Sequence, residues 1–289
     1  MRVLDATARR ILDRLRLTVR PGSTATRQGG HRSPVLASGV EFADHRPYVA
    51  GDDFRRIDWR AFHRHGQLVM RQFEEERDAR IYVLLDLSGS MSRGKPPKLE
   101  LAKRVAAAFA YVGMKQFDRA VVVPFGEDLE REARPLRAPS DLPDVDDFLA
   151  KATAGGPTSF PQAVRSLATR FPQRGLAVVV SDLMTPKGFP EGFRTLGALG
   201  HEVRVVSIRC AEDDAPDFQG EIELHDAESG QKVRLRVSRD LLDAYAKEIA
   251  AHRGACRDAC RRAGGRFVDL DVAMPLDEML RTAFRGEER

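Results

Sequence analysis

The strongest constraint on the fold is an unbroken apolar run, Ile81 to Leu85, that is followed at once by a carboxylate. The run is too short for a helix and rich in strand formers, which predicts a strand buried on both faces of a parallel sheet. Asp86 is expected just past the strand end, where the chain leaves the core. Ligands of open α/β sheets bind at that carboxyl-terminal edge. Asp86, Ser88 and Ser90 carry oxygens at alternate positions there, a set that suits a small hard cation such as Mg²⁺.

Strand and helix patterns alternate from residue 80 onward, which predicts an open, mostly parallel α/β sheet with helices on both faces. The predicted strands cover residues 120–125, 176–180, 201–208 and 266–272, with a short edge strand at 129–136 and a hairpin at 221–237. The predicted helices cover residues 98–117, 144–153, 159–170, 189–199, 238–263 and 276–284, and Thr158 and Ser159 are expected to cap the third of them.

A second carboxylate, Asp182, follows the predicted strand at 176–180 as Asp86 follows the first one. In a parallel sheet both lie on the same edge, and neighbouring strands would bring them within reach of one ion. Thr158 stands in a glycine-flanked loop before a helix and can enter the same crevice.

Residues 1–79 are predicted to form an appended segment that packs on the main domain at 80–289. Apolar spacing predicts an amphipathic helix within residues 4–19. Polar and apolar residues alternate over 67–73, which indicates a half-exposed strand, so this segment is expected to contain short β elements.

Length and composition fit one large globular domain with an appended segment, since the chain has 289 residues, of which 42% are hydrophobic. No stretch approaches the roughly 20 apolar residues of a membrane span. The first residues are not a secretory signal, so a cytoplasmic protein is expected. The three cysteines are too few for a disulfide framework and are expected as buried thiols.

The charge of the chain is unevenly distributed. Residues 1–80 contain 16 Lys and Arg against 11 Asp and Glu, a net charge of +5, whereas the remainder has 31 against 32, a net charge of −1. The basic residues of the first part are interleaved with acids and lack an aromatic stacking motif. This pattern favours a protein contact, and nucleic-acid binding through the arginine-rich first 32 residues stays an alternative.

The polar residues of this edge resemble a known site. Asp86-Leu87-Ser88-Gly89-Ser90, with the later Thr158 and Asp182, is similar to the metal-ion-dependent adhesion site of von Willebrand factor A domains, in which Asp-x-Ser-x-Ser precedes a threonine and an aspartate. The family threonine follows two glycines directly, whereas Pro157 intervenes here. The resemblance implies that Mg²⁺ or another divalent cation is held by Asp86, Ser88, Ser90, Thr158 and Asp182.

The region ahead of this domain contains a set of spaced polar and aromatic residues: Arg46, Tyr48, Gly51, Asp52, Arg56, Asp58 and Trp59. With this signature it resembles one bacterial and archaeal family, domain of unknown function fifty-eight. Many relatives carry transmembrane helices ahead of this region, and this chain has none there. The family is similar to proteins that accompany MoxR-type AAA+ ATPases, which implies such a partner in the assembly or maturation of other proteins.

The sequence therefore predicts a noncatalytic, metal-dependent protein-interaction module. A phosphoryl-transfer aspartate of the haloacid type would need a second Asp where Ser88 stands, and the Gly-x-Ser-x-Gly elbow of serine hydrolases is missing. No P-loop or dinucleotide glycine motif occurs. A metal-dependent hydrolase that uses Asp86 and Asp182 remains an alternative, as does a purely structural role of the short polar residues in capping the turn.

Overall fold

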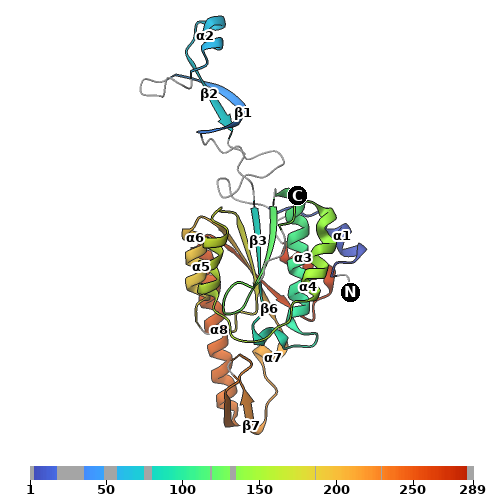
Figure 1. Ribbon diagram of the computed structural model, residues 1–289. Helices are drawn as coiled ribbons and strands as arrows, with labels where there is room; N and C mark the ends of the chain where they lie inside the picture. The colour runs from blue at the N-terminus through green and yellow to red at the C-terminus, as the bar shows by residue number, and fades with distance from the viewer. Residues whose placement is uncertain are drawn as a thin grey trace.

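The computed structural model describes residues 3–17, 36–48, 57–74, 80–117, 119–130, 135–185, 187–228 and 230–284. Its centre is a five-stranded sheet in the order β4-β3-β5-β6-β9, with all neighbours parallel (Figure 1). The sheet confirms the predicted α/β fold class. The strands are β3 (Arg80–Asp86), β4 (Arg119–Phe125), β5 (Leu176–Ser181), β6 (Glu202–Arg209) and β9 (Arg266–Asp271).

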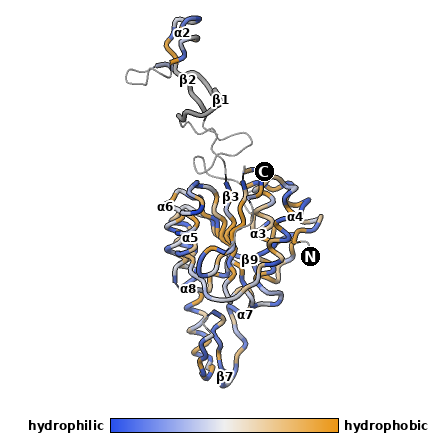
Figure 2. The backbone as a smooth tube through the Cα atoms, in the orientation of Figure 1, coloured by the Kyte–Doolittle hydropathy of each residue, from blue (hydrophilic) through white to orange (hydrophobic). Residues whose placement is uncertain are grey.

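Strand β3 occupies the inner part of the sheet because both of its faces are apolar. Residues 81–86 of β3 are all buried, as are all residues of β5, its neighbour. Ile81 pairs with Leu176 and Leu85 with Val180, so the two strands run in register to the same edge. The hydropathy colouring of Figure 2 places the most apolar part of the chain along these central strands. Asp86, the last residue of β3, and Asp182, the residue after β5, therefore lie at the same edge of two neighbouring strands.

Helices cover both faces of the sheet, and each face has its own apolar cluster. One cluster joins the sheet to α1 (Ala6–Leu12), α3 (Lys98–Gln116), α4 (Leu142–Ala150) and α9 (Leu276–Ala283). The other joins it to α5 (Phe160–Arg170), α6 (Phe189–Ala198) and α8 (Arg239–Arg262). The cysteines are buried free thiols in these layers, as predicted.

Short elements gather at the carboxyl-terminal edge of the sheet. A 3-10 turn (Gly89–Ser92) follows β3, and α7 (Ala211–Asp214) follows β6. The predicted hairpin is present as β7 (Gly220–His225) and β8 (Lys232–Val237), and it leads directly into α8, whose N-cap Ser238 accepts a hydrogen bond from the Leu241 N–H. A further 3-10 turn at Pro139–Asp141 precedes α4.

A second unit precedes the sheet in the chain. It contains β1 (Leu36–Pro47), α2 (Trp59–His65) and β2 (Val69–Glu74), and β1 pairs with β2 antiparallel. Figure 1 shows the three elements grouped beyond the amino-terminal edge of the sheet. The β elements agree with the predicted β content of this segment. Its packing on the main domain stays a prediction.

The first helix is shorter than predicted. It begins after Asp5, whose carboxylate accepts the Ala8 N–H at 2.7 Å, and ends at Leu12 rather than near residue 19. Leu15 and Leu17 are still buried, but an irregular segment carries them, and the Leu17 N–H bonds Gln116 of α3. Apolar spacing alone could not distinguish a helix from a segment held by another helix.

Two local predictions are wrong. Residues 129–136 do not form a strand in their described part, where Leu129 and Leu136 make only isolated bridges to β4. Helix α5 has Ser159 as its N-cap residue, yet no side-chain cap hydrogen bond is formed. The Thr158 hydroxyl instead donates to the Gly126 carbonyl at 3.1 Å, because the preceding loop is tied to the β4 end.

Candidate functional site

The first residue of the site, Asp86, belongs to the strand and does not lie past its end. Its side chain is 1% exposed. One carboxylate oxygen accepts the Ser88 N–H at 2.8 Å, and the other accepts the Ser181 hydroxyl at 2.5 Å. Burial raises the pKa of Asp86 to about 7, and the nearby charge of Asp182 acts in the same direction. A buried strand end tolerates this carboxyl group because both of its oxygens have hydrogen-bond donors.

The two serines form a pair of neutral oxygens beside Asp86. Their hydroxyl oxygens, Ser88 Oγ and Ser90 Oγ, lie 3.0 Å apart. The 3-10 turn that begins at Gly89 brings them together, and the Ser92 hydroxyl closes it by donating to the Gly89 carbonyl at 2.7 Å. The serines therefore present hydroxyl groups rather than charges to the crevice.

The loop that carries Thr158 is fastened to the serine turn by backbone hydrogen bonds. The Gly155 N–H donates to the Leu87 carbonyl at 2.8 Å, and the Gly89 N–H donates to the Gly156 carbonyl at 3.1 Å. Thr158 thereby reaches the serine turn although it lies far away in the sequence. Its hydroxyl donates to a carbonyl and keeps its oxygen lone pairs available.

Asp182 stands in a tight turn at the end of β5. Its Oδ1 accepts the Met184 N–H at 3.0 Å, while the Ser181 hydroxyl accepts the Leu183 N–H at 2.9 Å. Leu183 is buried with a φ of 59°, a left-handed conformation that is unusual for a branched side chain. Such outliers persist only where the surroundings over-determine them. The turn therefore holds Asp182 in one fixed direction.

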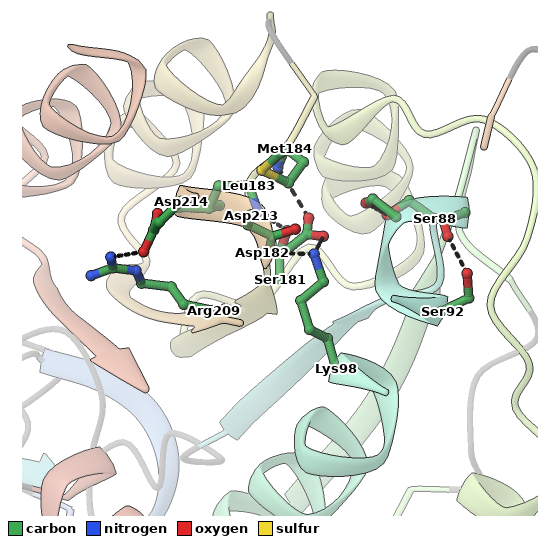
Figure 3. Close-up of polar contacts among 12 residues, drawn as sticks. Ser88, Ser92, Lys98, Ser181, Asp182, Leu183, Met184, Arg209, Asp213 and Asp214 are labelled. Carbon is green, nitrogen blue, oxygen red and sulfur yellow. Dashed lines mark hydrogen bonds and ion pairs between the residues drawn. The ribbon is translucent and has the colours of Figure 1, made fainter. Parts of the chain in front are cut away.

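A buried lysine completes the site. Lys98, the first residue of α3, is fully buried, and its Nζ lies 2.6 Å from Asp182 Oδ2 and 2.7 Å from Asp213 Oδ2. Figure 3 shows the side chain extending from the helix to the two carboxylates. Burial by itself would lower the pKa of Lys98, but the two carboxylates outweigh it and hold the pKa above the usual value. The ammonium is therefore charged and fully paired.

The short helix α7 supplies Asp213 and is itself anchored by charge. Asp214 pairs with Arg209 of β6 (Figure 3). It also pairs with Arg253 of α8. The Tyr245 hydroxyl donates to the Asp213 carbonyl at 2.9 Å. These contacts orient one acidic residue toward Lys98 and the next one away from it.

The site has a hydroxyl side, formed by Ser88, Ser90 and Thr158, and an ionic side, formed by Lys98, Asp182 and Asp213. A divalent cation fits the hydroxyl side better than the ionic side. In the described part of the chain, no three His, Cys, Asp or Glu side chains form a group that could hold a metal ion. Asp182 Oδ2 is already bound to the Lys98 ammonium, and both Asp86 oxygens accept hydrogen bonds. A cation would therefore depend on the serine and threonine hydroxyls, with the two aspartates behind them.

Sequence reasoning missed Lys98, Asp213 and Ser181. The sequence around Lys98 is typical of the first turn of a helix. No local pattern indicates that its side chain extends to the carboxyl-terminal edge of the sheet. Asp213 offered a signal, because an acidic triplet follows a buried strand on the same edge as Asp182. Ser181 is the last residue of an apolar strand, and the carboxylate that follows it is the stronger signal for a ligand.

The family-signature residues lie only partly in the described chain. Asp58 is 8% exposed and caps α2 by accepting the Ala61 N–H at 3.1 Å. Trp59 is 58% exposed, and its ring meets that of Phe62 edge-on. Arg46 is in β1 and Tyr48 just after it. The signature positions outside the described residues are Gly51, Asp52 and Arg56.

Comparison with known proteins gives a family. The sequence profile of the family described as "Protein of unknown function DUF58" matches residues 44–255. The uncharacterized protein Rv1480 of Mycobacterium tuberculosis strain H37Rv is 28% identical over 269 residues, which cover 89% of this chain and 82% of that protein.

Solved structures give more distant likenesses. The conserved hypothetical protein BatB of Bacteroides thetaiotaomicron has 19% identity and a TM-score of 0.43, covering 72% of this chain and 98% of that one. A von Willebrand factor type A protein from Catenulispora acidiphila has 13% identity and a TM-score of 0.42, and the match covers 74% of this chain and 42% of that one. Likenesses of this size say nothing about ligands. Among the helices of the described ranges, none is long and apolar enough to cross a membrane.

Proposed function

Since this chain belongs to the DUF58 family, we propose that it is a noncatalytic protein-interaction module whose docking depends on a divalent cation at the carboxyl-terminal edge of the sheet. The ligands that we propose are the hydroxyls of Ser88, Ser90 and Thr158. Asp86 and Asp182 would support the cation wholly or partly through water. When bound, the cation supplies an electrophilic position that an outside carboxylate can occupy.

The spacing of the two serine hydroxyls carries this proposal. Mg²⁺ holds oxygen ligands at about 2.0–2.1 Å in an octahedral shell, so that neighbouring ligands lie about 2.9 Å apart. Ser88 Oγ and Ser90 Oγ are 3.0 Å apart without any adjustment of the turn. Ca²⁺ binds at 2.3–2.6 Å, often in a pentagonal bipyramid whose neighbouring equatorial ligands lie about 2.7–3.1 Å apart. The spacing of the pair therefore suits Mg²⁺ and also admits Ca²⁺.

The charge balance explains why a partner would contribute an acidic group. Neutral hydroxyls leave the charge of a cation uncompensated, and Asp182 Oδ2 already binds the ammonium of Lys98. A carboxylate from another protein would remove that imbalance and take the place of a water molecule. We propose a MoxR-type AAA+ ATPase as the partner, on the family resemblance alone, and a cytoplasmic location.

The pairing of the hydroxyls supports a noncatalytic role. A serine nucleophile needs an adjacent general base. Ser88 and Ser90 bond each other, and the Thr158 hydroxyl donates to a backbone carbonyl. These contacts offer no base to Ser90 or Thr158, whereas the Ser88 hydroxyl also contacts the Asp86 carboxylate.

A pull-down between this chain and a MoxR-type ATPase tests the proposal. We expect retention with Mg²⁺, loss of retention with EDTA, and loss in the Ser90→Ala variant even with Mg²⁺. Ser90→Ala leaves both hydrogen bonds of Asp86 in place, so that it removes a ligand and keeps the strand end.

The matched control is Ser92→Ala, which removes a hydroxyl from the same turn that we do not propose as a ligand. Retention that is equal with Mg²⁺ and EDTA, and equal in Ser90→Ala and Ser92→Ala, would contradict metal-dependent docking. Phosphoester turnover that disappears in Asp86→Ala would contradict the noncatalytic role.

A further inference from the structure

The tip of the β7–β8 hairpin lies against the serine turn. A Cβ atom added to Gly89 would stand 2.3 Å from the Ala227 carbonyl oxygen and 2.8 Å from its carbonyl carbon. Real Cβ atoms do not approach backbone atoms so closely, so the tip fits only because residue 89 is glycine. Residue 89 lies between Ser88 and Ser90, whose hydroxyls are two of the three proposed ligands.

The next residue of the tip reaches the threonine loop. Glu228 is half-buried, and the Thr158 backbone N–H lies close enough to stabilise its charged carboxylate. Burial raises the pKa of Glu228 above its usual value, and the charges of Asp226 and Asp182 act in the same direction. A carboxylate on an exposed hairpin would ordinarily point into solvent. This one is half-buried and lies close enough to Asp182 for the charge of Asp182 to affect its pKa.

The hairpin turn is built to hold this position. The Glu228 N–H donates to the Asp226 carboxylate at 2.9 Å, and the Asp226 N–H donates to the Gln231 carbonyl at 2.8 Å. Gly230 has a φ of 70°, which a side chain would disfavour. These contacts hold the described residues on either side of position 229 in a turn.

We infer that the hairpin tip is an internal occupant of the docking site, with the Glu228 carboxylate in the place that an acidic side chain of a partner would take. This inference rests on the proposed function, because it identifies the group that a partner must displace. The hairpin belongs to the same chain, so its carboxylate is present at high effective concentration. A partner then binds with an affinity that is reduced by the fraction of molecules in which the tip is closed.

Closure of the tip can be measured without any metal. Hydrogen exchange at the Thr158 amide is compared in the wild type, in Glu228→Ala and in Glu221→Ala, which removes an exposed glutamate from the same hairpin. We expect exchange to become several-fold faster in Glu228→Ala alone. Equal rates in the wild type and Glu228→Ala would overturn the closure.

A second variant displaces the tip by changing the serine turn instead of the hairpin. Gly89→Ala keeps Glu228 but places a methyl group where the Ala227 carbonyl now lies. We expect faster exchange at Thr158 in this variant as well. Protection that persists in folded Gly89→Ala would show that the tip does not seat on the serine turn and would overturn the inference.

Competition is measured with Mn²⁺ as the metal and acetate as a simple carboxylate, through the proton relaxation of metal-bound water. We expect acetate to displace this water at lower concentration in Glu228→Gln and Gly89→Ala than in the wild type or in Glu221→Gln. A tip that is closed in about nine-tenths of the molecules predicts a shift of about tenfold.

The possible failures are distinguishable. An identical acetate response in all variants that bind Mn²⁺ would overturn the competition by Glu228. An absence of Mn²⁺ binding in every variant would overturn the metal-dependent docking and with it the competition by Glu228. Hydrogen exchange at the Thr158 amide would then be the only test of whether the hairpin tip is closed.

Discussion

The hydroxyl side and the ionic side of the site are made of the same edge of one sheet, yet they satisfy their polar groups differently. On the hydroxyl side, Ser88 and Ser90 bond each other and Thr158 bonds a carbonyl. On the ionic side, Lys98 is held between the carboxylates of Asp182 and Asp213 with no exposed surface of its own. One side is neutral and open to substitution by a ligand, and the other is charged and closed.

The difference assigns separate tasks to the two sides. Buried ion pairs contribute little net stability, but they are costly to break because the remaining charge has no partner. The ionic side therefore fixes the turns after β5 and β6 relative to α3. The hydroxyl side can exchange weak hydrogen bonds for ligand bonds at little cost to the fold.

The largest effect is expected from breaking the ionic side. Lys98→Met leaves two buried carboxylates facing each other without an ammonium, which should lower the free energy of unfolding by about 3–5 kcal/mol. Urea denaturation measures this change. Lys103→Met is the control, because Lys103 pairs with the more exposed Glu100 on the same helix and such pairs contribute only about 0.2–1 kcal/mol. Similar losses in both variants would contradict the special role of Lys98.

A smaller effect is expected from the hydroxyl side, and only in the presence of metal. Mg²⁺ at about 100 times its dissociation constant should raise the free energy of unfolding of the wild type by about 2.7 kcal/mol. Ser90→Ala should lose most of this increment while unfolding much like the wild type in EDTA. Thermal melts with Mg²⁺ and with EDTA measure it, with Ser92→Ala as the reference. An increment that survives in Ser90→Ala would exclude that hydroxyl as a ligand.

The smallest expected effect is a pH dependence of stability that arises at the opposite edge of the sheet. It serves as a reference because it involves neither the hydroxyl side nor the ionic side. His201 is 6% exposed, and its Nδ1 accepts the Gly175 N–H at 3.2 Å. Burial lowers the pKa of His201 below its ordinary value of 6.5. As the pH falls below 6.5, His201 binds a proton in the unfolded chain before it does so in the folded protein. The contribution of His201 to stability is therefore present above pH 6.5. It is lost as the pH falls toward the pKa of His201 in the folded protein.

His201→Asn tests this sign, because its amide oxygen can accept the same N–H and does not titrate. We expect the stability of the wild type to fall more steeply than that of His201→Asn between about pH 6.5 and pH 5. Parallel curves from urea denaturation at several pH values would contradict it. The pH dependence of this edge can then be subtracted when the site itself is titrated.

The fold could be predicted from the sequence because its main elements have strong local patterns. Ile81 to Leu85 and Leu176 to Val180 are continuous apolar runs, and such runs indicate buried parallel strands regardless of their neighbours. Helix α2 was missed, since it is short and its only local signal is Asp58 at the cap. The predicted strand near Leu129 failed because its apolar residues pack without a continuous partner strand.

The site was predictable only in part, for a physical reason. Asp86 ends a strand and Ser88 and Asp182 follow strands, and the parallel sheet brings their positions to one edge. Lys98 and Glu228 enter that edge from a helix and a hairpin, where nothing in the neighbouring residues indicates the direction of the side chain. Long-range contacts of this kind are fixed by packing and not by local propensity.

The position of α1 has a consequence for how the molecule is made. Leu4 and Ala8 belong to the same apolar cluster as Met279 of α9, and α3 joins them through Phe109, which stacks on Phe284 with ring centroids 4.3 Å apart. A ribosome synthesises α1 long before α9, so this apolar surface waits for its cover until nearly the whole domain has emerged. This side of the molecule is therefore completed only after α9 has been synthesised, and its apolar surface is exposed until then.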